Sequence, residues 1–358
     1  TEIIQSWKVT AEEHYIVTDD GYVLLLERAF STVSRKYPII ITHGIAMNGL
    51  AYVMKQKIFL LTELGYDVWV LNFRGTWYSR GHMTLNFNDA KYWTYSINEL
   101  GVHDINKALK HVYKETKEKA IYIGFSMGTT SFFIHATTFP NITQQYVKGM
   151  IGLAPVINFK GITSIAKYSG HHLVWPILRF FIYRLWNGKM LPGFSKIFSR
   201  FITSSYGMYA AQLLLNLLFG YDYQQMDPYT FPLYPYWIDT VGAEVYSHYV
   251  QIYQDGVFQN YDHGTIQNVI NYGRIRPPSY NLSNVAVPVA LFVGANDILA
   301  TPTNAEQLYS ELPKTSRCGY HVIEFEKWNH IDFISAKDLN TYLYTHLFEV
   351  IEEMESGT

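Results

Sequence analysis

Short apolar runs alternate with stretches of helical periodicity over the first half of the chain. Residues 14–18 and 22–28 flank Asp19-Asp20-Gly21, a pattern that predicts a two-strand hairpin. Further strands are predicted at 38–44, 66–72, 120–123 and 147–155, with helices that end near Leu64 and span 98–113. Because strands and helices alternate, we predict an α/β fold with a mostly parallel central sheet flanked by helices.

The alternation stops between residues 158 and 260, where Phe, Tyr, Trp and Leu are frequent and runs such as 208–219 have helical character. A mainly helical insertion of about 100 residues explains this change. Beyond it we predict a strand at 287–294, a helix at 304–312, a strand at 320–325 and a closing helix at 335–353. The predicted division is a core of residues 1–157 and 261–358 and a helical cap of residues 158–260.

The composition adds an extensive apolar surface or pocket to this picture. Hydrophobic residues make up 48% of the 358 residues and aromatic residues 16%, whereas charged residues reach only 16%, well below the usual quarter or so. The net charge is −2, and no block of five or more Lys or Arg occurs. The charge therefore gives no reason to propose nucleic acid or an anionic membrane as a partner.

Neither a metal nor a cofactor is expected. The single cysteine, Cys318, excludes an intramolecular disulfide framework and a cysteine-based zinc site. His171 and His172 are adjacent, so they would point apart on a helix, and no H-E-x-x-H motif occurs.

Signals for targeting are weak. The chain begins without the basic and long apolar segments of a signal peptide and without an initiator Met, so it looks processed or trimmed. The sequons at Asn141 and Asn281 are compatible with secretion. The most hydrophobic stretch, residues 172–186, contains a proline and two arginines and is too short to span a bilayer. We expect it to be an amphipathic element at a pocket or interface, or a buried core helix.

The stretch "YIGFSMGTT", residues 122–130, places Ser126 between Gly124 and Gly128, where a predicted strand gives way to a predicted helix. A nucleophile elbow needs this context, because its serine sits on a tight turn between a strand and a helix. The structural alternative is that the two glycines only shape the turn and that Ser126 caps the helix.

A serine nucleophile needs a base that takes its proton and an acid that orients the base. Asp297 lies just beyond the predicted strand 287–294, and His330 lies in a loop before the last predicted helix. The order serine, acid, histidine is the order found with this kind of elbow. We therefore predict that Ser126, Asp297 and His330 form a catalytic triad.

Other residues compete for these roles. Asp297 alone could be part of an ordinary Asx turn. Asp332 is the rival acid, but two residues from the base it is expected to cap the final helix. His321 and His346 are rival bases, but one lies inside a predicted strand and the other inside a predicted helix.

The oxyanion of a tetrahedral intermediate needs hydrogen-bond donors. The backbone N–H of Met127, directly after the nucleophile, is one candidate, and the N–H of Ile45, after the strand that ends in Thr42-His43-Gly44, is the other. His43 precedes the nucleophile in the chain and is expected to brace this loop.

With these residues in place, the chain resembles the acid lipase family of α/β-hydrolases, which includes gastric, lysosomal and many insect lipases. The resemblance covers nearly the whole core. It is carried by the ordered motifs "EEHYIVTDDGYVLLLER" (12–28), "THGI" (42–45), "GYDVWVLNFRGTWYSRGH" (65–82), "YWTYSINELGVHDI" (92–105), "GFSMGTT" (124–130), "GLAPV" (152–156), "GANDILATP" (294–302) and "NHIDFI" (329–334). The resemblance implies an α/β-hydrolase fold with the same triad and the same oxyanion donors, Ile45 and Met127.

It also implies that residues 158–260 are a cap with a mobile lid, that a lipid interface could form through the cap, and that the protein is secreted or lysosomal. Arg74, Ser79 and Arg80 match a family stretch beside the core and are interpreted as structural. The expected activity is hydrolysis of apolar carboxylic esters through an acyl-enzyme, without a cofactor.

Departures from the family leave the substrate open. Met127 stands where the family often has Gln, and residues 240–244 replace the usual P-A-G-T-S segment of the cap. A cap this aromatic could enclose a small ester or a terpenoid as well as a long acyl chain. An acyltransferase with the same triad and a catalytically idle lipid carrier are the alternative functions, and the oligomeric state stays open.

Overall fold

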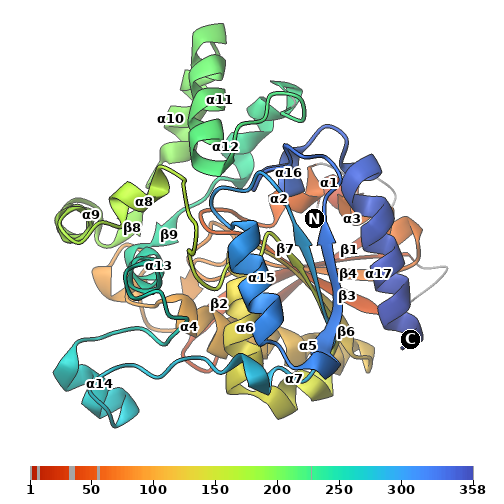
Figure 1. Cartoon of the computed structure of the whole chain (residues 1–358), viewed down its shortest axis with the longest axis horizontal. Coiled ribbons are helices and arrows are strands. Elements are labelled where there is room, and N and C mark those ends of the chain that lie inside the picture. Colours follow the sequence, from red (N-terminus) through yellow and green to blue (C-terminus); the bar gives the residue numbers. More distant parts are fainter. Residues whose placement is uncertain (1, 6–8, 32–36, 55–56, 227, 358) are drawn as a thin grey trace.

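A mainly parallel β-sheet runs through the centre of the molecule, and helices flank it (Figure 1). The computed structural model describes all residues except 1, 6–8, 32–36, 55–56, 227 and 358. The main sheet has the strand order β1-β2-β4-β3-β6-β7-β10-β11, and β5 pairs with β2. The bounds are β1 Thr10–Val17, β2 Tyr22–Phe30, β3 Pro38–Thr42, β4 Asp67–Leu71, β5 Gly81–His82, β6 Ala120–Phe125, β7 Val147–Leu153, β10 Val289–Val293 and β11 Arg317–Val322.

The predicted hairpin is confirmed, because β1 and β2 pair antiparallel with Val17 opposite Val23. The strand β2 also runs antiparallel to β4, whereas every pair from β4 to β11 is parallel. All residues of β3, β4, β6 and β10 are buried. Continuous burial is what a parallel sheet covered on both faces requires, and it explains why these segments are apolar runs without alternation.

The last strand differs from its prediction: β11 ends at Val322, three residues before the predicted end at Phe325. It forms the edge of the sheet and pairs only with β10. All six of its residues are half-buried or exposed. An edge strand lacks a neighbour on one side, so its apolar pattern fixes its ends only loosely.

Helices surround the sheet and account for much of the rest of the core. They are α1 Glu2–Gln5, α2 Leu50–Val53, α3 Lys57–Glu63, α4 Ile97–Glu99, α5 Asn106–Thr116, α6 Met127–Thr138, α7 Pro140–Tyr146, α15 Pro302–Glu311, α16 Asp332–Ser335 and α17 Thr345–Ser356. The closing helix predicted at 335–353 is present but starts later: the π-helix η6 Asn340–Tyr344 leads directly into α17. Its start is displaced because Ala336 is extended (ψ 147°) and forms a β-bridge with Met226, a residue more than 100 positions away.

Residues 158–260 lie to one side of the sheet and are mainly helical (Figure 1). Their elements are α8 Ala166–Ser169, α9 Val174–Trp186, β8 Lys189–Met190, α10 Phe194–Phe201, α11 Ser205–Phe219, α12 Tyr234–Trp237, β9 Val241–Gly242 and α13 Ala243–Asp255. Figure 1 shows α10 and α11 projecting from the top of the molecule, and α14 Thr265–Tyr272 at its lower left. The division into core and cap at residue 260 stays a prediction.

Helix α9 forms most of the hydrophobic stretch 172–186. The sequence allowed two interpretations of this stretch, an amphipathic element at an interface or a buried core helix. Only Trp175 and Ile182 are buried along it, and residues such as Ile177, Phe180 and Leu185 are exposed. It is therefore not a core helix. Among the described residues, we find no helix with the length and apolar character needed to cross a bilayer.

Candidate active site

Ser126 occupies a sharp turn between β6 and α6, with φ 51° and ψ −112°. A non-glycine residue adopts such a positive φ only at a cost, which is typical of functional turns. A Cβ on Gly128 would lie 2.3 Å from Thr42 Oγ1, and one on Gly124 would lie 2.8 Å from the carbonyl carbon of Gly128. The two glycines are thus required by close packing of the turn. The Ser126 side chain makes no capping hydrogen bond, so the capping alternative is not supported.

The three predicted triad residues meet at this turn. Ser126 Oγ lies 2.9 Å from His330 Nε2, and His330 Nδ1 lies 2.7 Å from Asp297 Oδ2. The bonds join residues separated by 204 and 33 positions in the chain. Distances of this size are those of a hydroxyl, a base and an orienting acid in a relay.

Asp297 is held by the loop that follows β10. Its Oδ1 accepts hydrogen bonds from the backbone N–H groups of Leu299 (2.9 Å) and Ala300 (2.7 Å). The carboxylate is 2% exposed, so its Oδ2 is directed at His330 in a site without bulk water. The Asx turn that sequence offered as an alternative is present and fixes the acid in position.

The imidazole of His330 is packed between two phenylalanines. The ring of Phe219, at the end of α11, stacks on it at 5.5 Å with an interplanar angle of 18°. The ring of Phe125, from β6, lies at 5.1 Å on a tilted plane. The cap and the core thus both contact the candidate base.

Asn329, next to His330, anchors this loop. Its side-chain oxygen accepts hydrogen bonds from the N–H groups of Ile331 and Asp332, and its Nδ2 donates to the carbonyl of Gly220 (2.8 Å). The expectation that Asp332 caps the final helix is wrong: Asp332 is the first residue of α16, and its carboxylate accepts from the N–H of Asn329 (2.7 Å).

The rival histidines lie elsewhere. His321 is in β11 and His346 is exposed on α17, where it contacts Glu349. His43 braces its loop as expected, because Nε2 accepts a hydrogen bond from the N–H of Phe73 (3.1 Å) while Nδ1 contacts the carbonyl of Gly44. Burial lowers the pKa of His43 to about 4, so the ring is neutral and can accept that bond.

The two predicted oxyanion donors border the turn. Met127 begins α6, so its N–H has no partner within the helix. Ile45 lies in the turn after β3, and in the described part of the chain no acceptor takes its N–H. Their assignment to an oxyanion hole stays a prediction.

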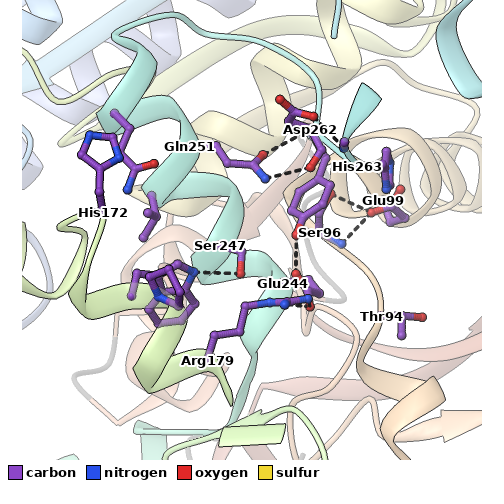
Figure 2. Close-up of a pocket in the computed structure, with 16 residues that line it drawn as sticks. Thr94, Ser96, Glu99, His172, Arg179, Glu244, Ser247, Gln251, Asp262 and His263 are labelled. Carbon is purple, nitrogen blue, oxygen red and sulfur yellow. Dashed lines mark hydrogen bonds and ion pairs between the residues drawn. The ribbon is translucent and has the colours of Figure 1, made fainter. Parts of the chain in front are cut away.

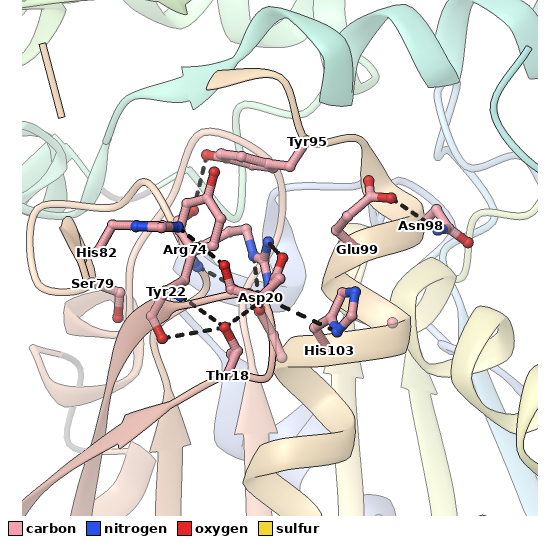
Figure 3. A network of polar contacts seen from close by, with 12 residues as sticks. Thr18, Asp20, Tyr22, Arg74, Ser79, His82, Tyr95, Asn98, Glu99 and His103 are labelled. Atoms are coloured by element: carbon pink, nitrogen blue, oxygen red, sulfur yellow. Dashed lines mark hydrogen bonds and ion pairs between the residues drawn. The ribbon is translucent and has the colours of Figure 1, made fainter. Parts of the chain in front are cut away.

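Arg74, which we interpreted as structural, is the centre of a buried polar cluster (Figure 3). Its guanidinium contacts Asp104 (2.6 Å) and Asp20 (2.5 Å). Burial disfavours its charge, but the two carboxylates hold its pKa above the ordinary value. The cluster ties the β1–β2 turn to the segment before α5 and leaves the triad untouched.

A groove lies away from the triad, between α9, α13 and residues 261–264 (Figure 2). It measures about 690 Å³. On its wall, Glu244 accepts hydrogen bonds from Arg179, Tyr183 and Tyr261. These partners lower the pKa of Glu244 although burial opposes the charge. None of the triad residues lines this groove.

The triad itself is closed off from solvent. Ser126 is 5% exposed and His330 3%. In the described ranges no group of three His, Cys, Asp or Glu side chains could hold a metal ion.

Sequence reasoning missed the residues by which the cap contacts the catalytic loops. Phe219 ends the run 208–219, for which only helical character is predicted, yet Phe219 and Gly220 contact the loop of His330. Nothing in the local pattern marks them. Asn329 lies in the motif "NHIDFI" (329–334), but the motif alone does not indicate its hydrogen bond to Gly220.

Comparison with known proteins gives two family matches. Residues 37–337 match the model of the α/β hydrolase fold, and residues 1–56 match a partial α/β-hydrolase lipase region. The chain is 30% identical to gastric triacylglycerol lipase of Rattus norvegicus, covering 99% of this chain and 91% of the relative. It is 28% identical to Lipase 1 of Drosophila melanogaster, covering 100% of this chain and 80% of the relative.

Solved structures share the fold. A monoacylglycerol lipase of Paleococcus ferrophilus is similar with a TM-score of 0.53 and 16% identity, covering 94% of this chain and 99% of that chain. An α/β hydrolase from Penicillium has a TM-score of 0.58 and 12% identity, covering 97% and 99%.

Proposed function

This chain belongs to the α/β-hydrolase family and, within it, to the lipases related to gastric triacylglycerol lipase, and from that premise we propose that it hydrolyses carboxylic esters of apolar substrates with Ser126 as nucleophile. The observation that carries the proposal is the continuous hydrogen-bond chain from Ser126 Oγ through His330 to Asp297.

In the proposed reaction, Ser126 Oγ attacks the ester carbonyl carbon while His330 Nε2 takes the hydroxyl proton. The negative oxygen of the tetrahedral intermediate accepts hydrogen bonds from the N–H groups of Met127 and Ile45. The intermediate then expels the alcohol, which leaves with the proton from His330. A water molecule attacks the acyl-enzyme by the same route and releases the carboxylic acid.

Asp297 orients His330 in this scheme. Its Oδ2 accepts a hydrogen bond from Nδ1–H, which leaves Nε2 free to accept the proton from Ser126. The carboxylate also stabilises the imidazolium that forms during each half of the reaction. Because the site is dry, this charge interaction is stronger than it would be in water.

The test compares p-nitrophenyl butyrate and palmitate as substrates for the protein and for Ser126→Ala. We expect turnover in the wild type and a loss of about 10⁴-fold or more in the variant, because the acyl-enzyme cannot form. Ser310→Ala, an exposed serine on α15, is the matched control and should keep wild-type turnover. Equal turnover by Ser126→Ala, with an unchanged circular dichroism spectrum, would contradict the proposal.

We also propose that the cap supplies the contact with a lipid surface. The outward face of α11 carries an apolar stripe at helical spacing, formed by Tyr206, Tyr209, Leu213, Leu214 and Leu217. Exposed apolar stripes of this kind suit an apolar surface rather than water.

The charge of this part of the chain supports the same partner. Between residues 158 and 221 the sequence has seven Lys or Arg and no Asp or Glu. The net charge of −2 for the whole chain conceals this basic half of the cap. Basic residues beside apolar side chains favour an anionic lipid surface.

A secreted or lysosomal location is proposed from the gastric lipases among the relatives. Asn281 is the better of the two candidate glycosylation sites, because Asn281 and Ser283 are both exposed, whereas Thr143 of the other sequon is buried. Expression in a eukaryotic secretory host should give a protein whose electrophoretic mobility changes on deglycosylation, and Asn281→Gln should abolish that change. An unglycosylated secreted product would contradict the assignment of Asn281.

A further inference from the structure

Two buried carboxyl groups lie on neighbouring segments beside the loop of His330. Asp332 belongs to α16 and is 1% exposed, and Asp222 follows α11 and is 0% exposed. The β-bridge between Met226 and Ala336 and the bond from Asn329 Nδ2 to the carbonyl of Gly220 hold these two segments together. Two carboxyl groups can share a hydrogen bond only when one of them carries a proton.

One oxygen of each carboxyl group has a partner. Asp332 Oδ2 accepts from the N–H of Asn329, and Asp222 Oδ1 accepts from the N–H groups of Gln224 and Gln225. Within the described residues, Asp332 Oδ1 and Asp222 Oδ2 have no hydrogen-bond partner, and both are buried. A buried polar atom left unpaired is costly, and a proton shared between these two oxygens would satisfy both.

The pair connects the end of the cap helix to the catalytic loop. Asp222 lies three residues after Phe219, which stacks on the imidazole of His330. Its N–H donates to Asn216 Oδ1 on α11 (2.7 Å), and Gly220 accepts from Asn329. An attraction between Asp222 and Asp332 would therefore also keep Phe219 and Gly220 against the loop of His330.

We propose that Asp222 and Asp332 are positioning residues, a proton-sharing acid pair that fastens the end of α11 to the loop of His330 and releases it when the shared proton is lost. The inference rests on the proposed role of His330, and it adds a pH-dependent contact between cap and catalytic loop.

Charges around the pair set the direction of its titration. Burial in the first place, and then the carboxylates of Asp222 and Asp297, raise the pKa of Asp332 to about 8. His330 lies two residues away on the same loop, bonded to Asp297. On the other side Asp338 accepts from Gln225 Nε2, and the side chain of Lys337 is exposed.

The consequence for stability follows from proton linkage. The folded state holds a proton on Asp332 between the ordinary pKa of 3.8 and about 8, whereas the unfolded chain does not. Stability from this group is therefore complete below the ordinary pKa and is lost progressively as the pH rises toward about 8. Above that value the two carboxylates repel each other and the fastening is weakest.

The experiment uses Asp332→Asn, which keeps an oxygen acceptor for Asn329 and offers an N–H donor to Asp222 Oδ2, but cannot titrate. The first readout is kcat for release of butyric acid from p-nitrophenyl butyrate at pH 6 and pH 9. We expect the wild type to lose at least fivefold between the two and Asp332→Asn to lose less than twofold. Asp338→Asn, an acid on the neighbouring segment outside the pair, should lose as much as the wild type.

The second readout is thermal unfolding from pH 5 to pH 9, which needs no activity. The Tm of the wild type should fall more steeply with pH than that of Asp332→Asn. Asp222→Asn should flatten the curve in the same way, since it also removes the shared proton. Asp332→Ala, which leaves Asn329 and Asp222 without a partner, should lower Tm at every pH.

Parallel pH curves for the wild type and Asp332→Asn, in both readouts, would overturn the acid pair. If the wild type hydrolyses no ester, the unfolding curves still decide the pair, so failure of the proposed function is distinguishable from failure of this inference.

Discussion

The surroundings of Ser126 in the core and the outer face of α11 in the cap differ in which side chains they bury. The core buries polar side chains, whereas α11 exposes apolar ones. Around Ser126 the core buries polar side chains, and those of the triad are hydrogen-bonded to one another. On α11 the cap exposes tyrosines and leucines to solvent. Buried polar groups are retained only when they are paired, and exposed apolar stripes usually indicate an external partner.

The two regions also differ in how they are held in place. The serine turn is fixed by two glycines, by close packing against β3 and by a strained Ser126. The end of α11 contacts the loop of His330 through the ring of Phe219 and the carbonyl of Gly220.

The largest expected effect comes from adding one methyl group to the serine turn. Gly128→Ala would place its Cβ 2.3 Å from Thr42 Oγ1 and 2.9 Å from the Thr42 carbonyl oxygen. We expect a loss of about 1–3 kcal/mol in the free energy of unfolding, because the backbone of β3 must shift, and a loss of esterase activity because Ser126 shifts with it. Urea denaturation and p-nitrophenyl butyrate turnover measure the two effects.

A glycine-to-alanine substitution at Gly242, in the cap, is the control for Gly128→Ala. Gly242 has φ −69°, and a Cβ there would lie 3.4 Å from the nearest atom, on the ring of Tyr95. Gly242→Ala should change the free energy of unfolding by no more than about 0.5 kcal/mol. Equal losses at both positions would show that the core turn is no more rigid than the cap.

A smaller effect is expected from the outer face of the cap. Leu213→Ser/Leu217→Ser should weaken binding to vesicles of phosphatidylcholine and phosphatidylglycerol about tenfold, or ~1.4 kcal/mol, because two apolar side chains no longer enter the lipid. Flotation measures the binding, which should also weaken with added salt because the cap is basic. Turnover of p-nitrophenyl butyrate should not change.

Leu64→Ser, on an exposed leucine of the core, is the matched control and should bind vesicles like the wild type. If the double variant also binds like the wild type, the lipid contact lies elsewhere. If it binds less to a protein partner but equally to vesicles, the stripe of α11 is a protein interface.

The sequence determined the parts of this molecule that depend on neighbouring residues. The hairpin at Asp19-Asp20-Gly21, the buried parallel strands and the turn around Ser126 are all local patterns, because turn chemistry and apolar runs act over a few residues. The order of Ser126, Asp297 and His330 was also readable, because each follows a predicted strand.

Only the tertiary structure decided how the cap meets the catalytic loop. The bond from Asn329 to Gly220 joins residues 109 positions apart, and the contact between Met226 and Ala336 displaces the start of the closing helix from its predicted position. Asp222 and Asp332 are buried because segments far apart in the chain pack around them. Such contacts form when distant segments pack together, and the local sequence carries no period or spacing from which they could be predicted.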